Sequence, residues 1–279
     1  MNDFQARRLR SFAMGLVNAN KIIEEKKPDL LLVPMRGSVP LIDGINVVNP
    51  NFDNSIVYYI PASSSILNVA KIIPKTIANI LHSLLDFYII TGLEKRFLIM
   101  SIDEVVSGNS AIRVMKGARQ GINIFARNAA ESSLADKKDI EHAIRSIKSK
   151  IEYLTIGFEH GEHVALGKKR SKEYEDAKRS GVVIPVEVEF IITMDNPVYC
   201  PIVYESMPNS SGLNIKHLPV VKPEFFITQE YINLLAAIAA VVGTNPEDVC
   251  VRNLERILQH QEFIPKEFRQ VAGNALSQV

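Results

Sequence analysis

An apolar run from Phe97 to Ile102 ends abruptly in two carboxylates, and this feature restricts the possible folds most. The run is short, partly β-branched and preceded by charged residues, which favours a buried parallel strand over a helix. Asp103 and Glu104 follow at its carboxyl end. Ligands of open α/β sheets bind at the carboxyl ends of strands. The segment therefore predicts an α/β protein with a binding site at one edge of its sheet.

The small polar segment 107–110 comes next and predicts a turn that opens a helix at Ala111. Backbone N–H groups of such a turn can surround an anion. A purely structural interpretation stays open, in which Asp103 ends the strand and Ser110 caps the helix, because both residue types do this routinely.

A second apolar run, Leu30 to Val33, leads into a Met-Arg-Gly-Ser turn at residues 35–38. Its uninterrupted apolar character again indicates a strand buried on both faces. The chain thus carries two strand-turn segments of the same kind, about 70 residues apart in the sequence.

Residues 102–112, Ile-Asp-Glu-Val-Val-Ser-Gly-Asn-Ser-Ala-Ile, resemble the phosphoribosyl-pyrophosphate (PRPP) motif of type I phosphoribosyltransferases, in the version of orotate phosphoribosyltransferases. The resemblance implies that Asp103 and Glu104 hold the ribose hydroxyls with Mg²⁺ close by, as catalytic and metal-binding residues. It also implies that the turn wraps the 5′-phosphate of the substrate, through Ser107, Gly108, Asn109, Ser110 and Ala111.

The 35–38 turn resembles the pyrophosphate loop of the same family. The resemblance implies a charge-assisted contact from Arg36 as a catalytic group, and substrate contacts from Met35, Gly37 and Ser38. The alternative for Arg36 is an ordinary exposed turn residue.

Family members place a mobile catalytic loop after the second strand, which corresponds here to residues 61–75. Such a loop closes over the sugar phosphate and excludes water. By this resemblance Lys71 is a catalytic candidate. The alternative places Lys71 and Lys75 on a solvated helix face.

Strands and helices alternate along the chain, which predicts a parallel sheet flanked by helices, as in type I phosphoribosyltransferases. The predicted strands are 30–33, 55–60, 97–102, 122–126 and 151–158, and the predicted helices between them are 4–27, 69–87, 111–120 and 136–149. We expect an α/β core over 1–160 and a hood region over 161–221 with a β-hairpin built from 182–192 and 198–204. A C-terminal helical appendage over 222–279 is expected to contain helices 228–242, 246–260 and 265–276.

The composition narrows the class of partners. The chain has 279 residues with 47% hydrophobic content, and its 32 Lys and Arg nearly balance 31 Asp and Glu. No global field for nucleic acid or an anionic membrane is expected, so phosphate recognition must be local. Two cysteines without metal-ligand spacing, and a start without a signal-peptide pattern, predict a cytoplasmic protein.

Two charged segments in the hood region have competing interpretations. Residues 159–163, Glu-His-Gly-Glu-His, contain metal-ligand types, although a polar loop is the favoured reading. Residues 167–179 mix both charge signs at helical spacing and predict a solvated helix.

The first functional hypothesis is an enzyme, a Mg²⁺-dependent glycosyltransferase that moves a phosphoribosyl group and releases pyrophosphate. The alternative is a non-catalytic or atypical nucleotide-binding regulator, or an effector of a bacterial conflict system, that reuses this fold. Glu104 and Asn109, where the family usually has Asp and Gly, motivate the alternative. The C-terminal helices predict a homo-oligomer or a protein partner, or else simple capping of the core.

Overall fold

The computed structural model contains a five-stranded, fully parallel sheet flanked by helices. It describes residues 3–35, 37–91, 95–134, 136–161, 169–189, 204–206, 217–221, 227–245 and 249–269. The strand order is β2-β1-β3-β4-β5, and the strands are β1 (Leu30–Met35), β2 (Val57–Pro61), β3 (Phe97–Val105), β4 (Ile151–His160) and β5 (Val183–Val188). The predicted α/β class with a parallel sheet is confirmed.

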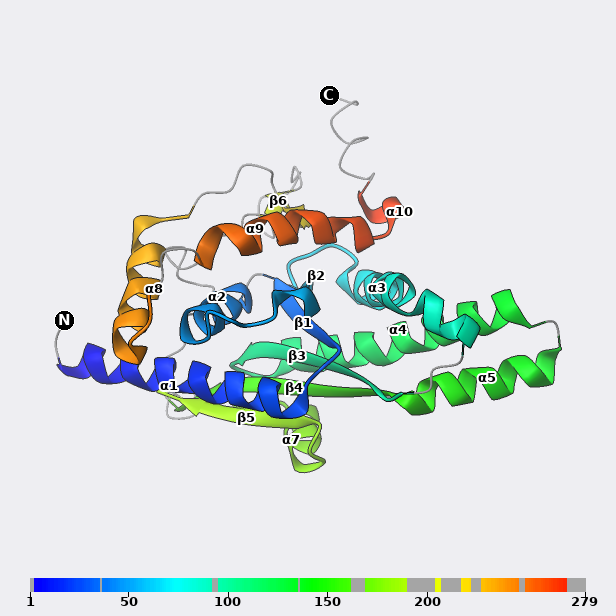
Figure 1. Cartoon of the computed structure of the whole chain (residues 1–279), viewed down its shortest axis with the longest axis horizontal. Coiled ribbons are helices and arrows are strands. Elements are labelled where there is room, and N and C mark those ends of the chain that lie inside the picture. Colours follow the sequence, from blue (N-terminus) through cyan, green and yellow to red (C-terminus); the bar gives the residue numbers. More distant parts are fainter. Residues whose placement is uncertain are drawn as a thin grey trace, which may run out of the picture.

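Helices cover both faces of the sheet because side chains of a strand alternate between the faces. Leu31 and Val33 pack with α1 (Asp3–Lys26) and α2 (Val39–Val48), whereas Leu30 and Leu32 pack with α3 (Val69–Thr91) and α4 (Asn109–Ser133). Helix α5 (Lys137–Lys150) runs back along α4 as an antiparallel neighbour (Figure 1). The sheet is therefore the middle layer of three.

The predicted strand 122–126 is wrong, because these residues lie inside the continuous helix α4. The glycines before this segment serve helix packing. A methyl group added at Gly117 would overlap the side chain of Ile73, and one added at Gly121 would crowd the carbonyl oxygen of Pro74. The glycines let α4 lie directly against α3.

The predicted hairpin arm 182–192 is a strand over residues 183–188, and this strand is β5, at the edge of the main sheet and parallel to β4. Helix α7 (Lys172–Arg179) connects the two strands, which makes a strand-helix-strand crossover. The main sheet therefore includes a strand that lies beyond residue 160, the predicted end of the α/β core. The other predicted arm, 198–204, lies outside the described residues except for Tyr204. A short antiparallel pair, β6 (Tyr204–Ser206) and β7 (His217–Val221), is present in the hood region.

The predicted helices 228–242 and 246–260 are present as α8 (Gln229–Val242) and α9 (Val249–His260). Of the predicted helix 265–276, residues Lys266–Arg269 form α10, and residues 270–276 lie outside the described residues. Helices α8 and α9 lie over α2, and α9 also contacts β2 (Figure 1). Apolar side chains of both helices, such as Leu235 and Ile257, belong to the core cluster of α1 and α2. These contacts support the capping interpretation, and an oligomeric or partner role stays a prediction.

Polar contacts also fasten these helices to the core. The buried carboxylate of Asp43 on α2 accepts hydrogen bonds from the Tyr231 hydroxyl of α8 and the Asn253 amide of α9. The backbone N–H of Tyr59 donates to Nδ1 of His260 at 3.1 Å, and burial lowers the pKa of this imidazole to about 4. His260 is therefore neutral at pH 7 and accepts as a neutral ring.

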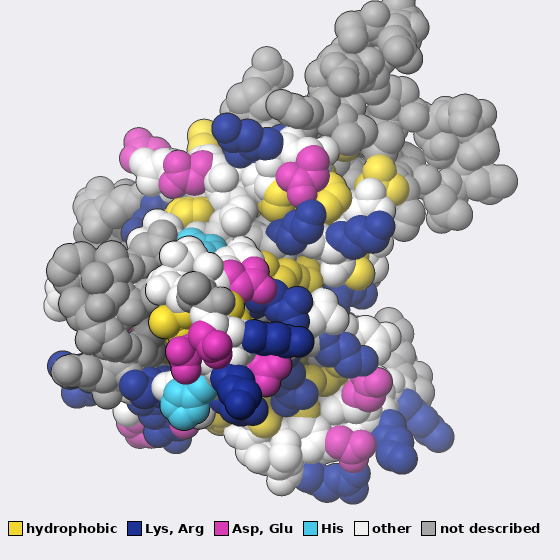
Figure 2. Space-filling model, turned by 90° about the vertical axis from the view of Figure 1, so that its right-hand side faces the viewer, with side chains coloured by type: hydrophobic (Ala, Val, Ile, Leu, Met, Phe, Trp, Pro, Cys, Tyr) yellow, Lys and Arg dark blue, Asp and Glu magenta, His cyan; other side chains and the backbone are white. Residues whose placement is uncertain are grey.

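The surface carries both signs of charge. On the face drawn in Figure 2, Lys and Arg side chains are interspersed with Asp and Glu side chains. Within the described ranges, every helix is too short or too polar to cross a membrane.

Burial raises the pKa of Asp43 to about 6, from an ordinary value of 3.8, against the hydrogen bonds that lower it. The folded protein therefore holds a proton on Asp43 more tightly than the unfolded chain does. The Asp43 contribution to the free energy of unfolding is greatest below pH 4 and is lost as the pH rises through about 6.

We expect Asp43→Asn to remove this dependence. Between pH 7.5 and pH 5, the wild-type free energy of unfolding should gain about 1.4 kcal/mol relative to the variant, measured by urea denaturation. Parallel pH profiles of the two proteins would contradict the assignment.

Candidate functional site

The strand order reverses direction at β1, because the chain moves from β1 outward to β2 and then returns across β1 to β3. In open α/β sheets of this order, the crevice between the carboxyl ends of β1 and β3 is the expected ligand site. The 35–38 turn follows β1, and the 103–111 segment lies at the end of β3. Sheet topology thus brings the two predicted motifs to the same crevice.

One hydrogen bond joins the two motifs. The Ser38 hydroxyl donates to Oδ1 of Asp103 at 3.1 Å, and both residues are buried. Ser38 stands at the N-cap position of α2, yet its side chain makes no capping bond. A serine at an N-cap position usually accepts a hydrogen bond from a backbone N–H of its own helix. Here the Ser38 hydroxyl bonds to the Asp103 carboxylate instead.

Asp103 is only 5% exposed, and burial raises the pKa of its carboxyl to about 6. The hydroxyls of Ser38 and Ser110 and the charge of Arg113 limit this rise. Its other oxygen, Oδ2, is buried and accepts no hydrogen bond of normal geometry within the described part of the chain. A buried carboxylate oxygen of this kind is prepared for a donor or a cation from a ligand.

The two adjacent carboxylates do not share a face. Asp103 and Glu104 are regular strand residues, paired in register with Gly157 and Phe158 of β4. Consecutive strand side chains point to opposite faces, so Asp103 faces α4 and Glu104 faces the α1–α2 side. Their joint role at a metal stays a prediction. Within the described ranges, no three His, Cys, Asp or Glu side chains form a metal-binding group.

The predicted phosphate turn opens α4. Gly108 is the N-cap residue and has a left-handed backbone (φ 76°), and no side chain caps the helix. The first amides of a helix have no partner within it. Of these, the Asn109 N–H makes only a long 3.4 Å contact to the Ser107 hydroxyl. The helix dipole adds positive potential at this end, so the turn suits an anion.

Helix α7 packs beside this turn. The Ser171 N–H donates to the carbonyl of Ser107 at 2.9 Å. The ring of Tyr174 lies against Gly108, and its hydroxyl lies over Gly157, so that a methyl group at either glycine would overlap it. Both glycines are required by the close approach of Tyr174.

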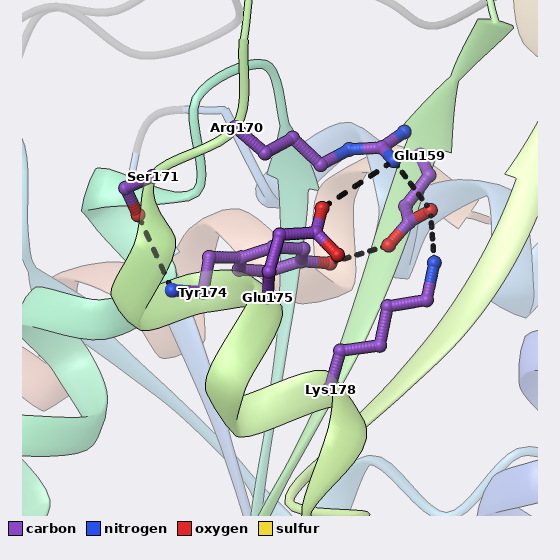
Figure 3. A network of polar contacts seen from close by, with 6 residues as sticks. All are labelled: Glu159, Arg170, Ser171, Tyr174, Glu175 and Lys178. Atoms are coloured by element: carbon purple, nitrogen blue, oxygen red, sulfur yellow. Dashed lines mark hydrogen bonds and ion pairs between the residues drawn. The ribbon is translucent and has the colours of Figure 1, made fainter.

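Glu159 holds Tyr174 and α7 in place (Figure 3). Its side chain is 1% exposed, and its Oε1 accepts from the Tyr174 hydroxyl at 3.0 Å. Lys178 Nζ and Arg170 Nη1 lie 2.8 and 3.1 Å from Oε2. The negative charge of Glu159 and its hydrogen bond raise the pKa of Tyr174 further than burial alone. The buried carboxylate is therefore compensated by two cations and a hydroxyl.

This network bears on the competing interpretations of the two charged segments, 159–163 and 167–179. Glu159 is an ion-pair partner here, while Glu162 and His163 lie outside the described residues. The predicted solvated helix exists as α7, but Tyr174 is fully buried on its inner face. Sequence reasoning missed Tyr174, Arg170 and Lys178. The i, i+4 spacing of Tyr174 and Lys178 was the available signal.

The remaining predicted residues are placed separately. Met35 is buried at the end of β1, Gly37 is partly exposed just after it, and Arg36 lies outside the described residues. Lys71 is exposed in the first turn of α3, as the solvated-face alternative expects. Ala111 is buried at the start of α4.

Comparisons of this chain with protein-family models, with curated proteins and with solved structures found no match.

We expect Gly108→Ala to destabilise the protein more than Gly181→Ala. Both glycines have φ 76°, but an added methyl meets Tyr174 at Gly108 and open space at Gly181. Each variant loses about 1–2 kcal/mol from the left-handed backbone, and overpacking adds about 1–3 kcal/mol at Gly108.

The comparison is made by chemical denaturation, also in a Tyr174→Gly background, which removes the ring and the Cβ of Tyr174, so that the cost of Gly108→Ala should fall to that of Gly181→Ala. An undiminished cost in that background would mean that Tyr174 is not the obstacle.

Proposed function

We propose that this protein binds a phosphorylated ribose, PRPP or a related compound, in the crevice between β1 and β3. The reaction that we propose is transfer of the phosphoribosyl group with release of pyrophosphate. The observation that carries the proposal is the hydrogen bond between Ser38 and Asp103, because it joins two motif segments 65 residues apart at the topological switch point.

Each part of the ligand has a proposed partner. Oδ2 of Asp103 accepts a ribose hydroxyl, which supplies the donor that this buried oxygen lacks within the described chain. The open first turn of α4, from Gly108 to Ala111, binds the 5′-phosphate. The 35–38 turn then faces the pyrophosphate, as the resemblance of that segment implies.

Mg²⁺ is the proposed cofactor. A carboxylate oxygen is a ligand type that Mg²⁺ prefers, and Mg²⁺ commonly takes its other ligands from phosphates and water. Oδ2 of Asp103 therefore fits one position of such an ion. When bound, Mg²⁺ supplies neutralisation of the charge that develops on departing pyrophosphate. Ser38 orients the Asp103 carboxylate, and no covalent residue is required.

A second candidate is a nucleotide-binding regulator or effector that does not turn over. The packing of Tyr174 against Gly108 favours it, because a turn fastened by α7 has less freedom to close around a moving substrate. The separation of Asp103 and Glu104 onto opposite faces of β3 favours it as well.

We expect Asp103→Asn to weaken Mg²⁺-PRPP binding by about 10–100-fold, because a hydrogen bond to a charged group contributes about 1.5–3 kcal/mol. Ser38→Ala should have a smaller effect, since it removes only the orienting bond. Isothermal titration calorimetry measures both, with Asp139→Asn on the exposed face of α5 as the control. Unchanged affinity in Asp103→Asn would exclude the crevice as the ribose site.

The pH dependence of the affinity provides a second test of the Asp103 carboxylate. Because its pKa is about 6, wild-type affinity should fall as the pH drops through 6, when Asp103 takes up a proton. The Asp103→Asn variant should lack this step.

Turnover separates the two candidates. With PRPP, Mg²⁺ and a panel of nucleobases, the enzyme should release pyrophosphate in proportion to the protein added, and Asp103→Asn should not. Tight binding of PRPP without any release would reject the transferase and retain the regulator.

A further inference from the structure

A hollow of about 370 Å³ lies between α3 and α4 and includes Asn109 of the turn among its lining residues. Its volume is within the range of small-molecule sites. It follows the first three turns of α4, from Asn109 to Gln120, and Glu173 of α7 lies at its rim. None of its lining residues belongs to the motif of β1.

The floor of the hollow is apolar and closely packed. Ile73 of α3 and Ile112 of α4 are buried there. The helices touch where Gly117 meets Ile73, and this contact closes the bottom of the hollow. Because Ile73 is fully buried and Ile112 is only 5% exposed, the floor offers little apolar surface, and a ligand must be held mainly by the polar walls of the hollow.

One wall is basic. Arg113 and Lys116 are three residues apart on α4, so their side chains share a side of the helix. Nη1 of Arg113 donates to the carbonyl of Ala62 at 2.8 Å, which orients the guanidinium. Within the described chain this is its one recorded hydrogen bond, and the group has five N–H donors.

Lys116 is restrained only weakly. Its Nζ lies 2.7 Å from Oε2 of Glu173, but the two side chains are 56% and 61% exposed. Exposed pairs of this kind contribute little stability. A ligand anion can therefore replace the Glu173 carboxylate on Lys116 at small cost.

We propose that this hollow is a second binding site, for a small organic anion that carries a phosphate or carboxylate group. Arg113 and Lys116 hold the anionic group, above the closed floor formed by Ile73 and Ile112. The amides of Asn109 and Gln120 lie at the edges of the hollow and offer further hydrogen bonds. The hollow shares Asn109 with the turn proposed for the 5′-phosphate, but Arg113 and Lys116 lie outside that turn, so the proposal does not depend on the phosphoribosyl function.

The test is a titration of ¹⁵N-labelled protein followed by amide chemical shifts, with inorganic phosphate in one series and benzoate in another. We expect a saturable shift of the Gly117 amide in the hollow, while Gly157, beside Asp103, serves as the reporter for the crevice. Saturation by phosphate alone identifies a phosphorylated ligand, and saturation by benzoate alone identifies a carboxylate. Either result supports the site.

Charge variants test the wall. Arg113→Gln should weaken the effective probe by about tenfold, as expected for loss of a charge-assisted contact. Glu173→Gln should strengthen it severalfold by releasing Lys116. Lys21→Gln, an exposed lysine on α1 across the sheet, is the matched control and should change nothing. The amide spectra also report whether each variant is folded.

Two outcomes would overturn the proposal: no saturable shift at Gly117 with either probe, or equal shifts in wild type and Arg113→Gln. Loss of the Gly117 shift in Asp103→Asn would show that the anion occupies the crevice instead. Retention of that shift, together with weakened PRPP binding, would separate the two sites.

Discussion

The arrangement of the sheet edge depends on how the buried carboxylate of Asp103 is accommodated. Removing a charged group from water is costly unless nearby groups compensate for the loss. Here the hydroxyls of Ser38 and Ser110 and the Glu104 backbone favour the charged form, and the charge of Arg113 supplies longer-range compensation. The compensation is partial, since the pKa of Asp103 remains near 6. Incomplete compensation in the folded protein is what makes Oδ2 a good partner for a ligand.

Glu159, two residues beyond the partner of Asp103 on β4, is the contrasting case. It is equally buried, but Lys178, Arg170 and Tyr174 satisfy both of its oxygens. A satisfied carboxylate of this kind fixes structure, in this case the position of α7. The same face of the sheet therefore carries two kinds of carboxylate. Glu159 has partners on both oxygens and holds α7, whereas Asp103 has one oxygen without a partner among the described residues, which is available to a ligand.

Sequence patterns predicted those elements whose local signal agrees with their environment. The apolar runs of β1 and β3 are almost entirely buried on both faces, so composition alone identified them. The strand predicted over residues 122–126 was wrong. Gly121 is typical of a turn in local sequence, but in the folded protein it allows close contact between helices. The place of residues 183–188 in the main sheet was not predicted, because alternating burial suits both a hairpin arm and an edge strand.

The candidate site could be predicted only in part, for a related reason. Asp103 and the turn after it could be predicted from the sequence, because carboxylates and small residues directly after an apolar run indicate a strand end followed by a turn. Its bond to Ser38 depends on β1 and β3 being neighbours, which no local pattern specifies. The burial of Tyr174 within a charged segment depends on two glycines, Gly108 and Gly157, from other elements. Long-range contacts of this kind are determined by the assembled sheet.

Arg113 links the two proposed sites through electrostatics. Its positive charge lowers the pKa of Asp103 in the crevice, and its guanidinium also lines the hollow. An anion bound in the hollow would neutralise part of that charge, so Asp103 would hold its proton to a higher pH. A ligand that needs the ionised form of Asp103 would then bind less tightly. By reciprocity, a ligand in the crevice would weaken anion binding in the hollow by the same factor. The position of one arginine thus gives negative coupling between the sites without any movement of the backbone.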